Sequence, residues 1–393
     1  MNAMIIAFKT QLFPNNKHRT YFQKACGVSR FAWNWGLDAW HKQYKIWEAS
    51  DKTDKSLRPS GLMLKKQLNA VKKAEFPWMY EVTKYAAQQP FINLQRAWSD
   101  FFNKKTMNGR LVGKPKFKKK GKCVDSFYVG GDQVSVKGKY IKVPNLGWVR
   151  MAEPVKYGGK INSMTISRVA DKWFVSFSID VDVSFIPSKS QARCGVDLGI
   201  SSLATLSSGD VRYWKTPKPL QNSLRKLARM QRRLAKKTKQ SNSYKRLVKR
   251  IGRLHKRIAD IRRNCLHQLT SYLIKNFAEV TIENLNVKGM LANGKLARHI
   301  ADVGMYEFRR QMEYKSQWYA TVLNIADRWF PSSKLCSDCG SKNTELTLSD
   351  RVYACTCGNN KCRDYNASIN LEYYTERSSG IYAAGDDGSA PTV

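Results

Sequence analysis

The arrangement of cysteines near the C-terminus is the feature that most constrains what this chain can fold into. Cys336 and Cys339 form a C-x2-C pair, and after fifteen intervening residues Cys355 and Cys357 form a C-x-C pair. A glycine follows each pair, and glycine permits the tight turn that directs two thiolates at one ion. This spacing is close to that of a zinc ribbon and one residue shorter in the second pair. The sequence therefore predicts a four-cysteine zinc site.

A fifth cysteine, Cys362, leaves the ligand set open. It follows the second pair closely, so it either replaces one of that pair's cysteines as a ligand or is a free thiol. The chain has nine cysteines, an odd number, clustered at a metal-like spacing. This pattern favours a reducing cytosol over a disulfide framework. No apolar run approaches the ~20 residues of a membrane-spanning helix, and the N-terminus is too short and too strand-like for a signal peptide.

Charge points to the class of partner. The 393 residues include 69 Lys+Arg and 30 Asp+Glu, for a net charge of +39. A compact chain this basic repels itself unless a polyanion neutralises it, and nucleic acid is the usual polyanion. A ribosomal or histone-like protein is the alternative, which the length and the aromatic content disfavour. Binding to a membrane surface would need an amphipathic anchor, and none is evident. We therefore expect an intracellular nucleic-acid-binding protein of two to four domains.

The first hundred residues predict one strand followed by helices. Met4–Phe13 has the pattern of a strand. The pattern then turns helical and unusually aromatic, and prolines, among them Pro90, are expected to mark helix ends. The expected helical segments are Phe31–Trp47, Leu62–Val71 and Tyr85–Phe102. Aromatic residues at helical spacing are ordinarily core, and the alternative is that some of them offer stacking faces to nucleic acid.

A lysine-rich segment separates these helices from a β-rich region. Gly113–Lys122 carries six lysines in ten residues and is either a solvated linker or a phosphate-binding segment. Short alternating segments between Ser126 and Ile179 then predict a small antiparallel sheet or barrel, which the N-terminal strand could join. The candidate phosphate-binding residues in the lysine-rich segment are Lys114, Lys116, Lys118, Lys119 and Lys120.

The most charged part of the chain predicts a helical hairpin. From Arg225 to Arg263 there are seventeen Lys or Arg and one acid, Asp260. Apolar residues from Leu247 through Ile261 to Cys265 recur in steps of four and three, which predicts a packed seam with basic outer faces. Such an excess favours contact with nucleic acid over simple solvation. The candidate residues are Arg225, Arg229, Arg232, Arg233, Lys245, Arg246, Lys249, Arg250 and Arg253.

Three acidic residues stand out by position. Asp197 lies in an apolar strand, Glu283 ends the apolar strand Glu279–Leu285, and Asp364 opens a late helical pattern. A carboxylate in an apolar strand is costly to bury unless it is paired or bound to a metal. Three converging carboxylates would raise one another's pKa, and divalent cations remove that penalty. Oxygen ligands favour Mg²⁺ or Mn²⁺, and the chemistry that uses such a cluster is two-metal hydrolysis of a phosphodiester. Between the last two acids, Tyr306–Ile325 predicts a single amphipathic helix.

Four ordered blocks of sequence resemble the TnpB family, transposon-encoded relatives of the type V CRISPR effectors. The blocks are G-V-D-L-G-I at 195–200, T-I-E-N-L-N-V-K-G-M at 281–290, D-R-W-F-P-S-S-K-L-C-S-D-C-G at 327–340 and C-R-D-Y-N-A-S-I-N-L at 362–371. The N-terminal helical region and the lysine-rich segment also look like this family, so the resemblance covers nearly the whole chain. Two departures are the C-x-C second pair, which is often C-x2-C in the family, and Cys362, which stands at the first Asp of the usual D-R-D.

The resemblance implies an α/β plus β fold. A RuvC-like (ribonuclease H-like) nuclease domain would carry helical-hairpin and zinc-ribbon insertions. A β-barrel wedge domain with a helical recognition insertion would precede it. The implied boundaries are 1–15 and 106–187 for the wedge, 16–105 for recognition, 188–333 and 359–375 for the nuclease with its hairpin at 218–277, 334–358 for the ribbon and 376–393 for a disordered tail.

The activity that the resemblance implies is RNA-guided DNA cleavage. The guide RNA would come from the transposon end, and the target would be double-stranded DNA beside a short adjacent motif. The expected assembly is one chain with one RNA. The expected location is the prokaryotic cytosol, in association with the nucleoid. By motif, Asp197, Glu283 and Asp364 match the catalytic, magnesium-binding acids, and the two cysteine pairs match the zinc ligands. The alternatives are a guide-dependent repressor or transposition regulator that does not cut, and a transposase that joins strands with the same acids.

Overall fold

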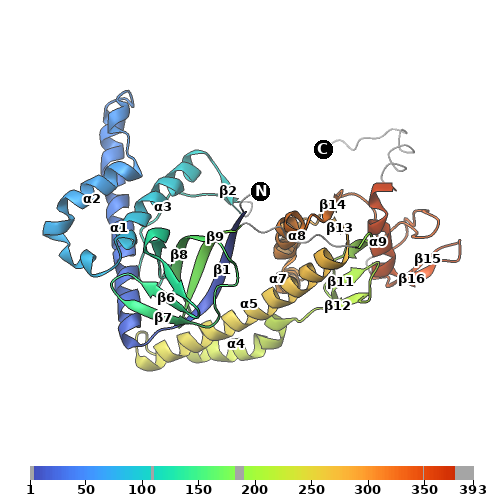
Figure 1. The fold of residues 1–393 in the computed structure, drawn as a ribbon. Helices are drawn as coiled ribbons and strands as arrows, with labels where there is room; N and C mark the ends of the chain where they lie inside the picture. The colour runs from blue at the N-terminus through green and yellow to red at the C-terminus, as the bar shows by residue number, and fades with distance from the viewer. Residues whose placement is uncertain (1–3, 108–109, 182–189, 348, 377–393) are drawn as a thin grey trace. The chain divides into compact units, whose positions relative to one another are not determined.

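The protein forms two compact units, Met1–Val183 and Ser184–Val393. The structure is a computed structural model that describes residues 4–107, 110–181, 190–347 and 349–376 (Figure 1). The tail expected at 376–393 lies outside the described residues, apart from Glu376. Among the described helices, none combines the length and the apolar character that a bilayer crossing requires.

A seven-stranded antiparallel sheet forms the body of the first unit. Its strand order is β4-β8-β9-β1-β7-β6-β5, so the predicted N-terminal strand lies at its centre. The two edge strands are joined by the four residues 131–134. That link spans at most about 18 Å, whereas seven strands laid flat would separate the edges by about 29 Å. The sheet must therefore curl. Its strands are β1 Met4–Phe13, β4 Ser126–Gly130, β5 Ser135–Lys137, β6 Tyr140–Val143, β7 Gly147–Met151, β8 Lys160–Val169 and β9 Lys172–Val181.

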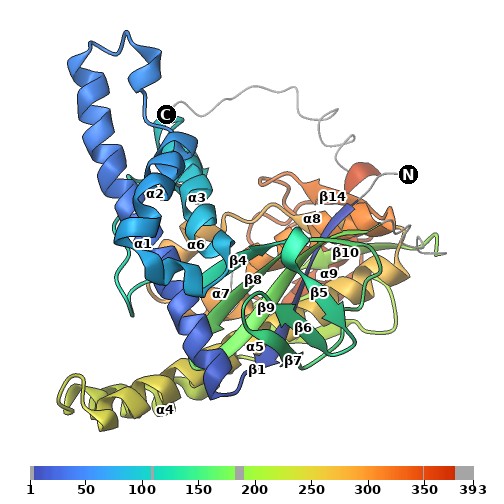
Figure 2. The ribbon, with the colours of Figure 1, turned by 60° about the vertical axis from the view of Figure 1, so that its left-hand side comes forward.

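Three helices pack against one another within the first unit (Figure 2). Each begins at a side chain that accepts a hydrogen bond from the first turn, for example Asn15 from the backbone N–H of His18. The aromatic residues lie mainly between these helices, where Trp40 and Trp98 stack with ring centroids 5.5 Å apart. The helices are α1 Asn16–Ala49, α2 Gly61–Glu75 and α3 Lys84–Phe102, and the short hairpin of β2 Thr106–Met107 and β3 Arg110–Leu111 follows them.

Helix α3 covers the predicted helical segment Tyr85–Phe102 and runs through Pro90, so this proline does not mark a helix end. Pro90 is the seventh residue of the helix, so its ring removes only one hydrogen bond near the N-terminus. The ring is buried in the unit, and this burial offsets part of the cost.

The second unit is built on a five-stranded mixed sheet in the order β12-β11-β10-β13-β14. The strands β10, β13 and β14 are parallel, and β11 and β12 continue the sheet antiparallel. The bounds are β10 Arg193–Asp197, β11 Ser202–Leu206, β12 Tyr213–Lys215, β13 Glu279–Glu283 and β14 Val322–Ala326; a separate pair, β15 Val352–Ala354 and β16 Asn360–Cys362, lies near the cysteines. The helices are α4 Pro219–Ala235, α5 Asn242–Asn276, α6 Val287–Ala292, α7 Ala297–Val303, α8 Met305–Tyr319 and α9 Arg363–Glu372.

The helical hairpin of α4 and α5 is present in the second unit (Figure 1). Its seam buries Leu247 and Ile258, but Ile261 is 39% exposed, so the regular seam predicted from the heptad spacing is interrupted there. Buried Asp302 on α7 holds the base of the hairpin. Its carboxylate accepts hydrogen bonds from the backbone N–H of Leu220 at 3.0 Å and from the guanidinium of Arg262 at 3.0 Å.

The prediction of one helix over Tyr306–Ile325 is wrong over its last six residues. Helix α8 ends at Tyr319, and Ala320 takes the left-handed conformation with φ +53°. The chain then forms β14, which pairs with β13 along its whole length. Apolar residues in Val322–Ala326 fit either periodicity over so short a run, and only the neighbouring strand decides the outcome.

A close approach of backbone to backbone sets the position of α9 on the sheet. A Cβ placed on Gly195 of β10 would lie 2.0 Å from the carbonyl oxygen of Ser368 and 2.4 Å from the backbone nitrogen of Glu372. Both atoms belong to α9, so only glycine lets the helix lie directly on this strand. The helix covers the face opposite the main core, whose cluster includes Cys194 and Val196 from the alternate positions of β10.

We predict that Gly195→Ala destabilises the second unit because the added methyl group meets main-chain atoms that cannot rotate away. The expected loss is about 3 kcal/mol in the free energy of unfolding, measured by chemical denaturation. Gly294→Ala is the matched control, since nothing lies within 4 Å of its added Cβ. Equal stability of the two variants would show that α9 does not lie on Gly195 as described.

Candidate functional site: a carboxylate cluster and a cysteine cluster

Two of the predicted acids end neighbouring parallel strands. The register pairs Gly195 with Thr281 and Val196 with Ile282, so the next pair along the two strands is Asp197 and Glu283. Side chains alternate between the two faces of a strand. Val196 and Ile282 point into the main core, and the two acids therefore lie on the opposite face, the one that α9 covers.

The third acid comes from the helix itself. Asp364 is in the first turn of α9, where negative charge is favoured by the helix dipole. Its neighbour Arg363 places a guanidinium nitrogen 3.6 Å from its carboxylate. The structure thus brings the three acids that the sequence singled out to one end of the sheet, although they are separated by up to 167 residues in the chain (364 minus 197).

The three carboxylates interact electrostatically. Burial raises the pKa of Asp197 well above its usual range, and the charges of Glu283 and Asp364 raise it further. Burial likewise raises the pKa of Glu283, which the Ser332 hydroxyl partly opposes. Among the described residues, only the four cysteines place one ligand atom each within 4.8 Å of all the others, and the three acids do not.

Ser332 is a site residue that sequence reasoning missed. Its buried hydroxyl donates a hydrogen bond of 2.7 Å to Oε1 of Glu283. Its carbonyl oxygen accepts a hydrogen bond of 2.8 Å from Asn370 of α9. Ser332 therefore connects the second acid to the helix that carries the third. The P-S-S segment was visible in the sequence, but nothing local indicated that its serine would reach a strand about fifty residues earlier.

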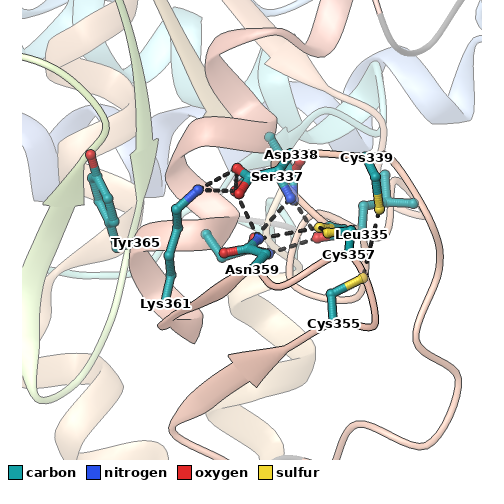
Figure 3. A network of polar contacts seen from close by, with 12 residues as sticks. Leu335, Ser337, Asp338, Cys339, Cys355, Cys357, Asn359, Lys361 and Tyr365 are labelled. Carbon is teal, nitrogen blue, oxygen red and sulfur yellow. Dashed lines mark hydrogen bonds and ion pairs between the residues drawn. The ribbon is translucent and has the colours of Figure 1, made fainter.

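The four predicted zinc ligands form one cluster. The sulfur atoms of Cys336, Cys339, Cys355 and Cys357 all lie within 4.8 Å of one another (Figure 3). The distances between Cys336 and Cys357 and between Cys339 and Cys355 are both 3.6 Å. Four sulfurs held tetrahedrally at 2.3 Å from a zinc ion are about 3.8 Å apart. The cluster therefore fits zinc, and Cys362 is outside it.

The backbone and the thiol chemistry of this cluster are also those of a metal site. Gly340 and Gly358, which follow the two pairs, have φ of +77° and +93°, as the turns require. The Ser341 hydroxyl lowers the pKa of Cys355 to about 6. The Asn359 backbone N–H lowers the pKa of Cys357, but the neighbouring thiols raise it more, to about 12. Four thiols this close to one another cannot all lose their protons unless a cation lies between them.

A buried network of asparagines joins the cysteine cluster to α9 (Figure 3). Asn359 donates to the Cys336 sulfur and to Oδ1 of Asn366, each at 3.2 Å. Asn366 and Asn370 both donate to the carbonyl oxygen of Leu335, at 2.6 and 2.7 Å. Asn366 is two residues after Asp364 on α9, so these hydrogen bonds connect the cysteine cluster to the turn of the helix that carries the third acid.

The predicted basic residues of the hairpin are all exposed. Four of them, Arg229, Arg233, Arg250 and Arg253, line a groove of about 440 Å³ between α4 and α5, together with Lys226 and Arg257. The lysines of the lysine-rich segment, in the first unit, differ from one another in exposure. Lys114, Lys116, Lys119 and Lys120 are exposed, whereas Lys118 lies 3.7 Å above the Trp33 ring, and burial lowers its pKa.

Known protein families match most of the chain. A family described as "Probable transposase" (OrfB_IS605) matches residues 176–294, and a "Cas12f1-like, TNB domain" matches 306–371. A "Helix-turn-helix domain" matches 1–46. In the described part of that last range, the structure has strand β1 followed by the single uninterrupted helix α1.

Whole-chain relatives agree with these matches. A "Putative RNA-guided DNA endonuclease" of Streptomyces pristinaespiralis is 31% identical, over 93% of this chain and 88% of that protein. The "Putative RNA-guided DNA endonuclease InsQ" of Escherichia coli K12 is 32% identical, over 89% and 87%. In fold, the chain is similar to the protein in "Cryo-EM structure of the Cas12f1-sgRNA-target DNA complex", with a TM-score of 0.51, 13% identity and coverage of 95% and 99%.

These findings define a mixed α/β protein whose fold is similar to that of Cas12f1. The chain belongs to the TnpB family, the transposase-associated family of these two bacterial relatives, and the resemblance found in the sequence blocks is confirmed.

We predict that the purified protein contains about one zinc ion per chain, measured by elemental analysis. Cys336→Ser should lose it, because three thiolates and a hydroxyl hold zinc weakly. Cys362→Ser is the matched control and should keep the zinc, since its thiol is outside the cluster. Zinc loss in the Cys362 variant would show that the ligand set is different.

We also predict that Asp197→Asn raises the melting temperature in EDTA at neutral pH. The pKa of Asp197 is higher in the folded than in the unfolded state, so its charge opposes folding at every pH above the unfolded value. Asparagine removes that charge. Mg²⁺ should then stabilise the wild type more than the variant, measured by differential scanning fluorimetry. A variant that melts below the wild type in EDTA would contradict the repulsion.

Proposed function

We propose that this chain is an RNA-guided DNA endonuclease that cuts its target at Asp197, Glu283 and Asp364. The observation that carries the proposal is the convergence of these acids, from two adjacent parallel strands and one helix, at one end of the sheet. The names of the whole-chain relatives support the same activity. The unit around this sheet would be the RuvC-like nuclease domain, with the α4–α5 hairpin and the zinc ribbon as its insertions.

The donor set fits magnesium or manganese. All three side chains offer carboxylate oxygens, which hard divalent cations prefer, and their mutual repulsion is the penalty that a cation removes. Asp197, Glu283 and Asp364 would hold the ions. When bound, two such ions supply an activated water and stabilise the leaving oxygen of a phosphodiester.

The protein's own residues keep this site in shape. Ser332 holds the Glu283 carboxylate in one orientation through its hydrogen bond. Gly195 lets α9 lie close enough for Asp364 to reach the strand ends. Arg363 places a positive charge beside Asp364 and lowers the pKa of Asp197, which favours the ionised, cation-binding form.

The partners that we propose are a guide RNA from the transposon end and double-stranded target DNA. Base pairing supplies the sequence specificity, so the protein needs mainly a basic surface for the backbone. The arginine-lined groove of the hairpin is one such surface. The exposed lysines of Gly113–Lys122 are a second one, in the first unit. We further propose that this unit comprises a wedge domain, built on the curled sheet, and a recognition domain of α1 to α3 that helps read a short adjacent motif.

In this proposal the zinc ribbon acts indirectly. The asparagine network fixes Asn366 to the backbone of the cysteine cluster, and Asp364 is half a turn away on the same helix. Removal of zinc would loosen that network and displace the third acid.

We predict that the protein expressed with its guide RNA cuts matching DNA in Mg²⁺ and not in EDTA. Asp197→Ala should reduce the rate of cleavage at least about a thousandfold, because a bound cation would lose one of its three carboxylate ligands. Binding of the target, measured by electrophoretic mobility shift, should change less than about threefold.

Two outcomes would contradict the proposal in different ways. Wild-type complex that binds its target and leaves it intact would favour the guide-dependent repressor. Cleavage by the Asp197→Ala complex at the wild-type rate would show that the acids are not the catalytic site. Joining of a labelled transposon end to target DNA would favour the transposase.

A further inference from the structure

One large apolar side chain, close in the chain to the serine that contacts Glu283, is mostly in solvent. The side chain of Trp329 is 83% exposed, more than any of the other large hydrophobic residues that the structure describes as exposed. It lies in the segment 327–332, between the end of β14 and Ser332. Single exposed apolar side chains are ordinary on a protein surface, so what distinguishes Trp329 is its place in the chain, three residues before the serine that contacts Glu283.

The segment holds Trp329 in place. The backbone N–H of Trp329 donates a hydrogen bond of 2.8 Å to the Asp327 side chain, which closes a tight turn. The Asp327 backbone N–H donates in turn to the Tyr374 hydroxyl at 3.1 Å. The next residue, Phe330, packs edge-to-face on the Tyr374 ring at 5.0 Å. Asp327 and Phe330 are therefore fastened to the unit, while the indole of Trp329 is exposed.

The far end of the segment reaches the catalytic acids. Ser332, three residues after Trp329, donates to Glu283 and is tied to α9 through Asn370. Three residues span at most about 11 Å. The Cα atom of Trp329 is therefore at most about 11 Å from that of Ser332, whose hydroxyl contacts Glu283.

The occupant that this geometry fits is a nucleic-acid base. Any base can stack on a tryptophan ring. A phosphate backbone is bound by positively charged side chains instead, so an exposed indole favours a base as its partner. A strand that is paired in a duplex has no free face to offer, so the base must be unpaired. Arg328, the adjacent residue, adds an exposed positive charge for the backbone of the same strand.

We propose that Trp329 stacks on an unpaired base of the DNA strand held at the carboxylates and so positions that strand for cleavage. This inference rests on the proposed function. Trp329 is a positioning residue: it contacts the substrate strand and takes no part in the transfer of the proton or the phosphoryl group.

Cleavage kinetics test the positioning. Trp329→Leu in the guide complex should lower the rate of cleavage at saturating target about tenfold, the value of one lost base stack. Trp329→Phe should retain most of the rate, because a phenyl ring still stacks. Trp148→Leu, at an exposed tryptophan of the first unit, is the matched control and should cut at the wild-type rate. A Trp329→Leu complex that cuts as fast as the wild type would overturn the proposal, as would equal losses in the Leu and Phe variants.

A fluorescence measurement tests the stacking itself and needs neither guide nor cleavage. A short single-stranded oligonucleotide containing 2-aminopurine, mixed with the Asp197→Ala protein in Mg²⁺, should be quenched on binding. The added Trp329→Leu change should remove most of that quenching, and the Trp148→Leu change should not. Equal quenching with and without the indole would overturn the proposal. Because no cleavage is needed, a wild-type complex that fails to cut would count against the proposed function alone.

The melting temperature separates stacking from a structural role. An exposed indole can be removed without loss of packing, so Trp329→Leu should melt within about 1 °C of the wild type. A clear fall in the melting temperature would show that the indole packs against the protein itself, and it would overturn the proposal.

Discussion

The contact between α9 and the strand β10 is the constraint on which the rest of the site depends. The helix backbone lies on Gly195 so closely that a methyl group would collide with its main chain. This approach carries Asp364 to the ends of the two strands that bear Asp197 and Glu283. A helix one side chain further away would leave two acids without the third, and two carboxylates offer far fewer ligand positions to a pair of cations.

Hydrogen bonds through α9 connect the carboxylate cluster to the cysteine cluster. The cysteine cluster is inserted just before α9, and the buried asparagines transmit its position to the helix through hydrogen bonds to Leu335 and Ser337. Ser332 makes the corresponding link from the helix to Glu283. Buried amides are costly when unpaired, so this network holds a single geometry. The carboxylates repel one another in the same place, and a bound divalent cation would relieve that repulsion.

Local patterns in the chain predicted much of this correctly. The zinc spacing and its glycines depend on only a few consecutive residues, and the structure has both turns and the cluster. The strand over Met4–Phe13 and the basic hairpin were likewise readable from periodicity. Three predictions failed where tertiary contacts outweigh local preference. Pro90 lies inside a helix because its ring is buried, the segment after Tyr319 is a strand because β13 is its neighbour, and Ile261 leaves the heptad seam.

The sequence by itself determined the identity of the chemical groups: three acids placed in apolar surroundings, four thiols at chelating distance along the chain, and an excess of positive charge. These follow from residue types and short spacings, which need no fold. Only the tertiary structure decided that the acids share one face of the sheet, that Cys362 is outside the cluster, that Ser332 contacts Glu283 and that the Trp329 indole is exposed. Such facts depend on which strands become neighbours and how closely a helix approaches them, and a linear pattern carries no information about either distance.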